Sequence, residues 1–368
     1  MKKILLISHS SDGGGAETVF LKTCNCLMPF CELSFFMPKN KGYLYDEVRG
    51  LNGNIYVGFN ALLQRSVLKN ILKIIFFNFF SIFRICWLIH SNKIDVVYSS
   101  TIINYIGVLA SLIMRKRHIW HIHEMNNPGH IWIDRKYNRV FRFLFKRSEL
   151  IFVANGAKES WLKYFNCSDF DVDCHVIYNP IKEIQPVVRN PRSVIKIGFA
   201  GSYGPNKNLK SFVNVMVDII KEYDDVKMFA VGKNIEENAE RLIDGRLKTN
   251  AYALSDHVNI DDFMNDIDIL VLPSFSESWG LVVFEAMSTG VIPIVTEATS
   301  LKEMLVDGVN LFYIDPNSEY DIYLKVKNVL NDFEMKKKII SKNNFRFLNE
   351  NKFNDNFNKK ILNVLACR

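Results

Sequence analysis

The sequence predicts an α/β protein with two domains, each built on a parallel sheet. The chain has 368 residues, enough for two domains of ordinary size with their own cores. Hydrophobic residues make up 48% of it and no low-complexity tract interrupts them, which indicates globular rather than disordered protein. Short apolar runs alternate with loops and helices in both halves, and this alternation is typical of parallel sheets.

In the first half, residues 3–8 form the first predicted strand. A glycine loop and a helix from Thr18 follow directly, and no cleavage site of small residues is present, so the opening residues do not resemble a secretory signal. Later strands of this half are predicted at residues 96–99, 118–123 and 150–154.

The second half repeats the pattern. Residues 195–200 predict a strand that leads through a polar loop into a helix from Leu209. The segment 179–191, rich in proline and polar residues, is the expected linker between the domains. Four later strands and a long C-terminal helical stretch are expected at residues 227–231, 258–260, 267–272, 292–295 and 336–365.

Composition narrows the function classes. Seven cysteines, odd in number and irregularly spaced, argue against a disulfide framework and indicate a reducing cytoplasm. The formal net charge of +7 suggests an anionic partner. No nucleic-acid recognition motif accompanies this charge, so nucleic acid is not an expected partner.

The most informative segment contains Glu277 and Glu285. A short apolar strand precedes Glu277 and apolar residues at helical spacing follow it, which places Glu277 in a loop at the carboxyl end of a strand. Open parallel sheets bind ligands at that edge, and the next helix directs free N–H groups there, which favours a phosphate. Carboxylates accept paired hydrogen bonds from vicinal hydroxyls, so one glutamate suits a sugar and the other a ribose.

This segment resembles the donor-site signature of the retaining glycosyltransferases of family 4, the glycosyl transferases group 1. The Glu-x7-Glu spacing and the flanking Pro-Ser, Gly-Leu, Glu-Ala-Met and Gly-x-x-Pro elements occur in that family's order. A bare glutamate pair would usually be structural, so the flanking elements carry the assignment. The resemblance implies that Glu277 lies against the donor sugar and that Glu285 holds the nucleotide ribose. The backbone implied to line the diphosphate and sugar is that of Ser278, Trp279, Gly280 and Leu281.

The same family has the GT-B fold, in which two facing Rossmann-like domains with parallel sheets have a cleft between them. By this resemblance, residues 1–185 form the N-terminal acceptor domain and residues 190–349 form the C-terminal nucleotide-sugar donor domain. The C-terminal helix, about residues 350–368, is implied to pack back on the first domain.

Gly14 and Gly15 belong to a loop of three glycines before the first helix. Glycines let a backbone approach an anion at a helix N-terminus, although a tight turn alone would also select them. The pattern is neither a complete dinucleotide fingerprint nor a P-loop, which argues against a nicotinamide or ATP site. The run from Gly14 to Glu17 matches the family's first-domain loop, which closes over the donor from the acceptor side.

Lys207 lies where the family places a lysine that neutralises the donor diphosphate, a role that suits a compact ammonium charge. Ser202 stands where the family commonly has an arginine, so half of the expected positive clamp is absent. This departure keeps open the alternative of a catalytically weakened partner subunit that binds a nucleotide-sugar. Without the resemblance, Lys207 would be interpreted as a surface lysine.

Two histidines form the other chemical cluster. Alternation along the predicted strand places His121 and His123 on one face, but no further ligands are spaced to complete a metal site. Two Asp-x-Asp pairs, which begin at Asp171 and Asp266, lack the strand context of the metal-dependent glycosyltransferase fold. The resemblance places His123 near the donor sugar, and the sequence predicts no required metal.

The resemblance implies a retaining glycosyltransferase that acts in bacterial surface polysaccharide biosynthesis. It would move a sugar from a nucleotide-diphosphate donor, a UDP-sugar in preference to a GDP-sugar, to a glycan or lipid-linked glycan acceptor. Glu277, His123 and Lys207 are the predicted catalytic residues, and no cofactor is expected. A GT-B sugar-nucleotide epimerase is an alternative, whereas a dinucleotide oxidoreductase would need a fingerprint that the chain lacks.

Basic and aromatic segments of the first half predict contact with an anionic membrane surface. Residues 115–117 and 135–147 are rich in arginine and lysine, and phenylalanines are interleaved in the second run. Residues 68–89 are apolar and aromatic but interrupted by polar residues, which predicts an interfacial rather than a spanning helix. Helices packed on a sheet with a solvated basic edge would explain these segments equally well. The expected location is cytoplasmic, peripheral on the inner face of the cytoplasmic membrane.

Overall fold

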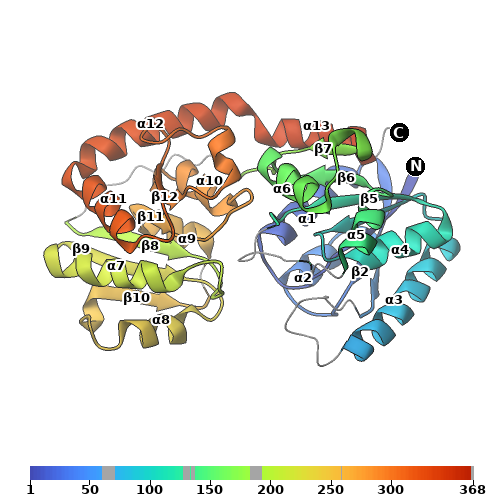
Figure 1. Ribbon diagram of the computed structural model, residues 1–368, viewed down its shortest axis with the longest axis horizontal. Helices are drawn as coiled ribbons and strands as arrows, with labels where there is room; N and C mark the ends of the chain where they lie inside the picture. The colour runs from blue at the N-terminus through green and yellow to red at the C-terminus, as the bar shows by residue number, and fades with distance from the viewer. Residues whose placement is uncertain (60–70, 127–132, 134–136, 183–192, 258, 366–368) are drawn as a thin grey trace. The chain divides into compact units, whose positions relative to one another are not determined.

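The chain folds into two compact units, each an α/β arrangement around its own parallel sheet (Figure 1). The first unit comprises residues 1–180 and 353–368, and the second comprises residues 181–352. This architecture agrees with the predicted fold class. The computed structural model describes residues 1–59, 71–126, 133, 137–182, 193–257 and 259–365.

The sheet of the first unit has the strand order β3-β2-β1-β4-β5-β6-β7, and every pair is parallel. The chain starts in the middle with β1, runs to one edge through β2 and β3, and then crosses back to β4. The order therefore reverses between β1 and β4, the kind of switch point where open α/β sheets bind ligands. The strands are β1 (Lys2–Ile7), β2 (Cys31–Met37), β3 (Gly53–Val57), β4 (Val96–Ser100), β5 (Arg117–Ile122), β6 (Glu149–Phe152) and β7 (Cys174–Val176).

Two groups of helices cover this sheet. Because crossovers between parallel strands are right-handed, α1 and α2 lie on one face and α3 to α6 lie on the other. Helix α13 (Phe353–Leu365) packs against α1, where the Cys26 thiol donates a hydrogen bond to the carbonyl of Asn358 at 3.6 Å. The other helices are α1 (Gly15–Leu27), α2 (Tyr43–Arg49), α3 (Ile71–Ser91), α4 (Tyr105–Met114), α5 (Asn138–Phe145) and α6 (Asn155–Phe165).

The sheet of the second unit has the order β10-β9-β8-β11-β12-β13 and is also parallel. Its switch point lies between β8 and β11, so the loops that follow these strands leave the same edge side by side. The core joins one face of the sheet to α7, α8 and α11. The strands are β8 (Ile195–Ala200), β9 (Val226–Val231), β10 (Tyr252–Ser255), β11 (Ile269–Leu272), β12 (Ile292–Thr296) and β13 (Phe312–Ile314). The helices are α7 (Leu209–Glu222), α8 (Ile235–Ile243), α9 (Ile260–Asp266), α10 (Leu281–Ser288), α11 (Glu319–Asn331) and α12 (Phe333–Asn351).

The predicted strands at the centres of both sheets are confirmed, but the strand expected at residues 258–260 is wrong. Ile260 begins α9, because the Asn259 side chain accepts a hydrogen bond from the Asp261 N–H at 2.9 Å and caps the helix. The edge strand of this region is β10, which lies earlier in the chain. Parts of several predicted segments lie outside the described residues, namely 68–70, 135–136, 183–191 and residue 258.

Candidate functional site

The loop from β11 to α10 carries Glu277. Its backbone is fixed by the Glu277 N–H, which donates to the carbonyl of Ala298 at 3.0 Å, and by the Ser300 N–H, which donates back to the carbonyl of Glu277. The Glu277 side chain is only 8% exposed, so its carboxylate needs a partner inside the fold. Lys207 provides that partner, with Nζ 2.5 Å from Oε1.

Lys207 reaches this carboxylate from the loop after β8. Gly201 has a φ of +157°, a backbone conformation that other residues rarely adopt, so glycine permits the path of the loop that leads to Lys207. The lysine remains 29% exposed. The ammonium group is therefore held at the surface of the second unit and within reach of a ligand.

Asn206 joins the two loops and was not predicted from the sequence. Its side-chain amide donates to the carbonyl of Ser276 at 2.9 Å and accepts from the Ser276 N–H at 3.1 Å. The Phe275 N–H also donates to the Asn206 carbonyl. These bonds fix the residues immediately before Lys207 and Glu277, so the geometry of the ion pair is set by backbone as well as by charge. The only signal in the sequence was an asparagine directly before Lys207.

Helix α10 begins directly after this loop. Gly280, with a φ of +66°, ends the loop in the left-handed region, and Leu281 is the first helical residue. The N–H groups of the first turn thus point out of the helix beside Glu277, where an anion is favoured. Ser278 is buried, and Trp279 stacks on Phe284 with ring centroids 4.9 Å apart. Trp279 therefore supports the loop with its side chain and can reach a ligand only through its backbone.

Glu285 lies in the second turn of α10 and is largely buried. The pKa of this carboxyl group is raised to about 7, chiefly by burial. The nearby Lys182 ammonium group lowers the pKa by a smaller amount, and the Asp261 carboxylate raises it. Lys182 and Asp261 form an ion pair with each other. Neither residue was predicted as part of the site, and both lie far from Glu285 in the sequence.

Ser202 lies in the same loop as Lys207, and its side chain is exposed. It brings no charge to the position where the family commonly has an arginine. Lys207 is the predicted phosphate-binding cation of this loop, and its ammonium group pairs with Glu277.

The candidate residues of the first unit lie after β1 and β5. Gly14 immediately precedes α1, which begins at Gly15, and a Cβ on Gly14 would lie 2.5 Å from Oε2 of Glu17, so Gly14 lets that carboxylate fold back over the helix start. Burial raises the pKa of Glu17 to about 6. The nearby His9 ring lies 3.3 Å from Glu17 Oε1, and burial lowers the pKa of His9 to about 4.

His123 is buried directly after β5. Burial, reinforced by His121 and His9, lowers the pKa of His123 well below its usual value, so the ring is neutral at physiological pH. The rings of His121 and His123 are 4.2 Å apart, as the predicted alternation requires. The carboxylate of Glu124 accepts from the N–H groups of His123 and Ile102 at 3.0 and 3.2 Å and fixes the end of the strand.

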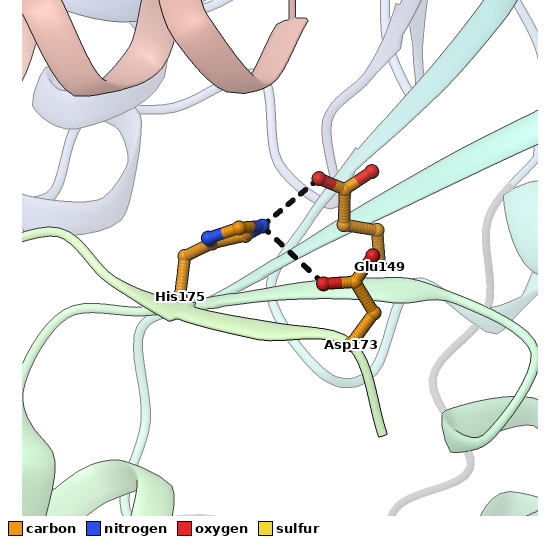
Figure 2. A group of neighbouring side chains, drawn as sticks. All are labelled: Glu149, Asp173 and His175. Carbon is orange, nitrogen blue, oxygen red and sulfur yellow. Dashed lines mark hydrogen bonds and ion pairs between the residues drawn. The ribbon is translucent and has the colours of Figure 1, made fainter. Parts of the chain in front are cut away.

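A separate cluster joins Glu149, Asp173 and His175, from β6, β7 and the residue before β7 (Figure 2). His175 Nε2 lies 3.0 Å from Glu149 Oε1 and 3.6 Å from Asp173 Oδ1. The other Glu149 oxygen accepts two hydrogen bonds from Arg117, which also donates to the carbonyl of Val364 in α13. Since a guanidinium already neutralises Glu149, we interpret this cluster as an ion-pair network that fastens α13 to the sheet.

Two family models match the chain. The model described as "Glycosyltransferase Family 4" matches residues 13–183, and the model described as "Glycosyl transferases group 1" matches residues 180–345. Together they span both candidate sites, and the chain belongs to this glycosyltransferase family.

Individual relatives agree with this family. The "Uncharacterized glycosyltransferase MJ1178" of Methanocaldococcus jannaschii is 23% identical over 254 residues, which cover 68% of this chain and 69% of the relative. The lipopolysaccharide core biosynthesis mannosyltransferase LpsB of Rhizobium meliloti is 24% identical over 193 residues, 48% of this chain and 53% of LpsB. The structure of Anabaena Alr3699/HepE in complex with UDP and glucose superposes with a TM-score of 0.81 at 18% identity, over 100% of both chains. The predicted GT-B fold is confirmed.

Proposed function

We propose that this glycosyltransferase transfers a sugar, with retention of anomeric configuration, from a nucleoside diphosphate to a glycan or lipid-linked glycan acceptor in bacterial surface polysaccharide synthesis. The observation that carries the proposal is the ion pair between Lys207 and Glu277 at the carboxyl edge of the second sheet, beside the start of α10. The similarity to LpsB, whose name assigns it to lipopolysaccharide core synthesis, supports the acceptor class.

The ion pair suits a site that binds a phosphate group. An arriving diphosphate offers the Lys207 ammonium group a second anionic partner, and the N–H groups of the first turn of α10 add to the attraction. The Glu277 carboxylate is then released to accept hydrogen bonds from sugar hydroxyls. As the bond between sugar and phosphate breaks, negative charge grows on the leaving phosphate, and the same lysine and N–H groups stabilise it. The oxygen of the acceptor hydroxyl forms the new bond to the anomeric carbon, and its proton passes to the departing phosphate oxygen.

Glu285 is proposed to bind the ribose. As a carboxylate it accepts from two vicinal hydroxyls, and its buried position removes competing water. In the first unit, the Gly14–Gly15 loop and the neutral ring of His123 are proposed to contact the donor from the acceptor side. We propose a UDP-sugar as donor, supported by the complex of HepE with UDP-glucose, and no required metal.

A panel of nucleotide-sugars tests this proposal, with the products identified by mass spectrometry. The protein is incubated with each donor, with and without a lipid-linked glycan acceptor, in the presence and absence of a chelator. We expect one UDP-sugar to yield a glycosylated acceptor together with UDP, unaffected by chelator. Conversion of the donor into an isomeric nucleotide-sugar without acceptor would instead indicate an epimerase, and binding of a donor without any product would indicate a weakened partner subunit.

A further inference from the structure

Helix α3 exposes a row of large aromatic side chains. Phe83 and Trp87 are each 61% exposed, although α3 packs closely on the first sheet. Exposed aromatic residues scattered singly are common, but six on one helix form a contiguous apolar patch of the kind that marks a binding surface. The exposed residues of this patch, called here the aromatic face, are Phe76, Phe77, Phe79, Phe80, Phe83 and Trp87.

The register of α3 is fixed from its buried side. Ile85, Leu88 and Ile89 are at most 1% exposed and belong to the core of the first unit. On the same side, the Asn78 amide donates to the Tyr105 hydroxyl at 2.5 Å. Rotating the helix to bury the aromatic face would expose these groups, so the outward orientation of the phenylalanines is a property of the fold.

The aromatic rings contact chiefly one another. Phe76 and Phe80 have ring centroids 4.8 Å apart, and so do Phe79 and Phe83. These edge-to-face and tilted contacts reduce but do not remove the cost of exposing the rings to water. A partner that accepts aromatic rings over a broad, shallow contact would gain the remaining free energy of transfer.

The charge around the aromatic face is of one sign. Helices α3, α4 and α5 contain no aspartate or glutamate. Contacts join α3 to α4 and α4 to α5, so the three helices form one layer over the sheet (Figure 1). Exposed apolar side chains continue over this layer at Ile113, Val140 and Phe143. The exposed cations of the layer and its helix ends include Arg84, Arg115, Arg139 and Arg147, whereas the exposed Lys146 pairs with Asp171 outside the three helices.

We propose that this layer docks on an anionic lipid surface, with the aromatic face of α3 inserted at the level of the headgroups and the arginines of α5 over them. Aromatic rings on one face combined with Lys and Arg beside them are the features of interfacial helices. Within the described part of the chain, no helix is long and apolar enough to span a bilayer.

A second copy of the chain is the competing occupant. In a two-fold dimer the same patch meets itself, so Arg84 and the α5 arginines would face their own copies. The layer offers no carboxylate from α3, α4 or α5 to pair with them, and like charges across an interface disfavour association. An anionic membrane meets both the apolar and the electrostatic requirement.

This docking rests on the proposed function in one respect, since a lipid-linked acceptor would lie at the same surface. The binding itself needs neither donor nor acceptor. It can therefore be measured separately from the reaction.

The test is flotation of the full chain with vesicles of phosphatidylcholine alone or mixed with phosphatidylglycerol, at low salt and at about 0.5 M salt. We expect binding to the anionic vesicles only, weakened by salt. The double variant Phe79→Ser/Phe83→Ser should reduce the partition coefficient about tenfold or more, because two inserted rings are removed. Arg139→Gln/Arg147→Gln should reduce it several-fold and weaken its salt dependence. Tyr320→Ser, on the exposed surface of the second unit, is the matched control and should bind like the original protein.

Three results would overturn the docking proposal. The first is equal binding to neutral and anionic vesicles at low salt, and the second is unchanged binding by the Phe79→Ser/Phe83→Ser variant. The third is a dimer in sedimentation that this variant dissociates while vesicle binding stays the same, which would assign the face to a second copy. Unfolding temperatures confirm that the variants are folded. Calorimetric binding of UDP separates the two proposals, because a lack of UDP binding by the original protein and by all variants would count against the donor site alone.

Discussion

At the scale of single residues, the ion pair between Lys207 and Glu277 joins the two candidate donor loops. The sequence predicted both residues, because each lies in a recognisable motif, but it could not predict that they pair. Pairing depends on how the loop after β8 and the loop after β11, which lie far apart in the sequence, leave neighbouring strands of the sheet. Asn206 was missed for the same reason, since its bonds to the Ser276 backbone exist only in the folded chain.

Replacing Lys207 by Met should weaken the binding of UDP about tenfold to a hundredfold. The change removes a charge-assisted contact to the diphosphate and takes the lysine partner away from the buried Glu277 carboxylate. Isothermal titration calorimetry measures the effect, with Lys210→Met, an exposed lysine in α7, as the control. Equal losses in the two variants would show that Lys207 acts only through the overall charge.

The affinity for UDP should rise as the pH increases from 6 to 8. Burial raises the pKa of Glu285 to about 7, and the carboxylate form is the one that accepts hydrogen bonds from both ribose hydroxyls. Below that pKa the group is protonated and binding must first release the proton, so affinity falls as the pH drops. Glu285→Gln cannot titrate and should give a flatter profile. A profile identical in both proteins would remove Glu285 from the ribose site.

At the scale of elements, the prediction succeeded where the apolar pattern was unambiguous. The central strands β1, β4, β8 and β11 are rich in apolar residues and are followed by loops, and all were predicted within two residues of their bounds. Five strands were missed, β2, β3, β7, β10 and β13. The three-residue strands β7 and β13 are too short for a periodic signal, and β3 is only partly buried.

The ion-pair network around Glu149, which joins α13 to the first sheet, also depends on contacts that no local sequence pattern reveals. Arg117→Ala should lower the free energy of unfolding of the first unit by roughly 1–3 kcal/mol, because it leaves the largely buried Glu149 carboxylate with less compensation and frees the Val364 carbonyl. Urea unfolding measures the loss, and Arg346→Ala, whose ion pair is exposed, serves as the control.

The contribution of this ion-pair network to the free energy of unfolding should depend on pH. Burial alone would raise the pKa of Glu149, but hydrogen bonds from His175 and Arg117 outweigh it and lower the pKa. A lowered carboxyl pKa contributes stability that is present above the unfolded value and is lost as the pH falls through the folded value. The difference between the original protein and Arg117→Ala should therefore shrink in acid. A constant difference from pH 7 to 3 would contradict this account.

At the scale of the whole molecule, the candidate residues belong to two units. Gly14, Gly15 and His123 lie in the first, whereas Lys207 and Glu285 lie in the second. The proposed donor contacts come from residues of both units, so we expect saturating UDP to reduce the radius of gyration. Small-angle X-ray scattering with and without UDP measures this change. An unchanged radius, with binding verified by calorimetry, would mean that the donor engages the second unit alone.

The central claim is that Glu277 orients the donor sugar in a metal-independent transfer, and the rate of transfer by Glu277→Gln tests it most directly. The variant keeps the size of the side chain but removes its charge, which should lower turnover about a hundredfold, the scale of losing one positioned electrostatic group. Glu237→Gln, an exposed glutamate of α8, should leave turnover unchanged, and so should excess chelator. Full activity of Glu277→Gln, together with loss of activity in chelator, would contradict the assignment of the donor site.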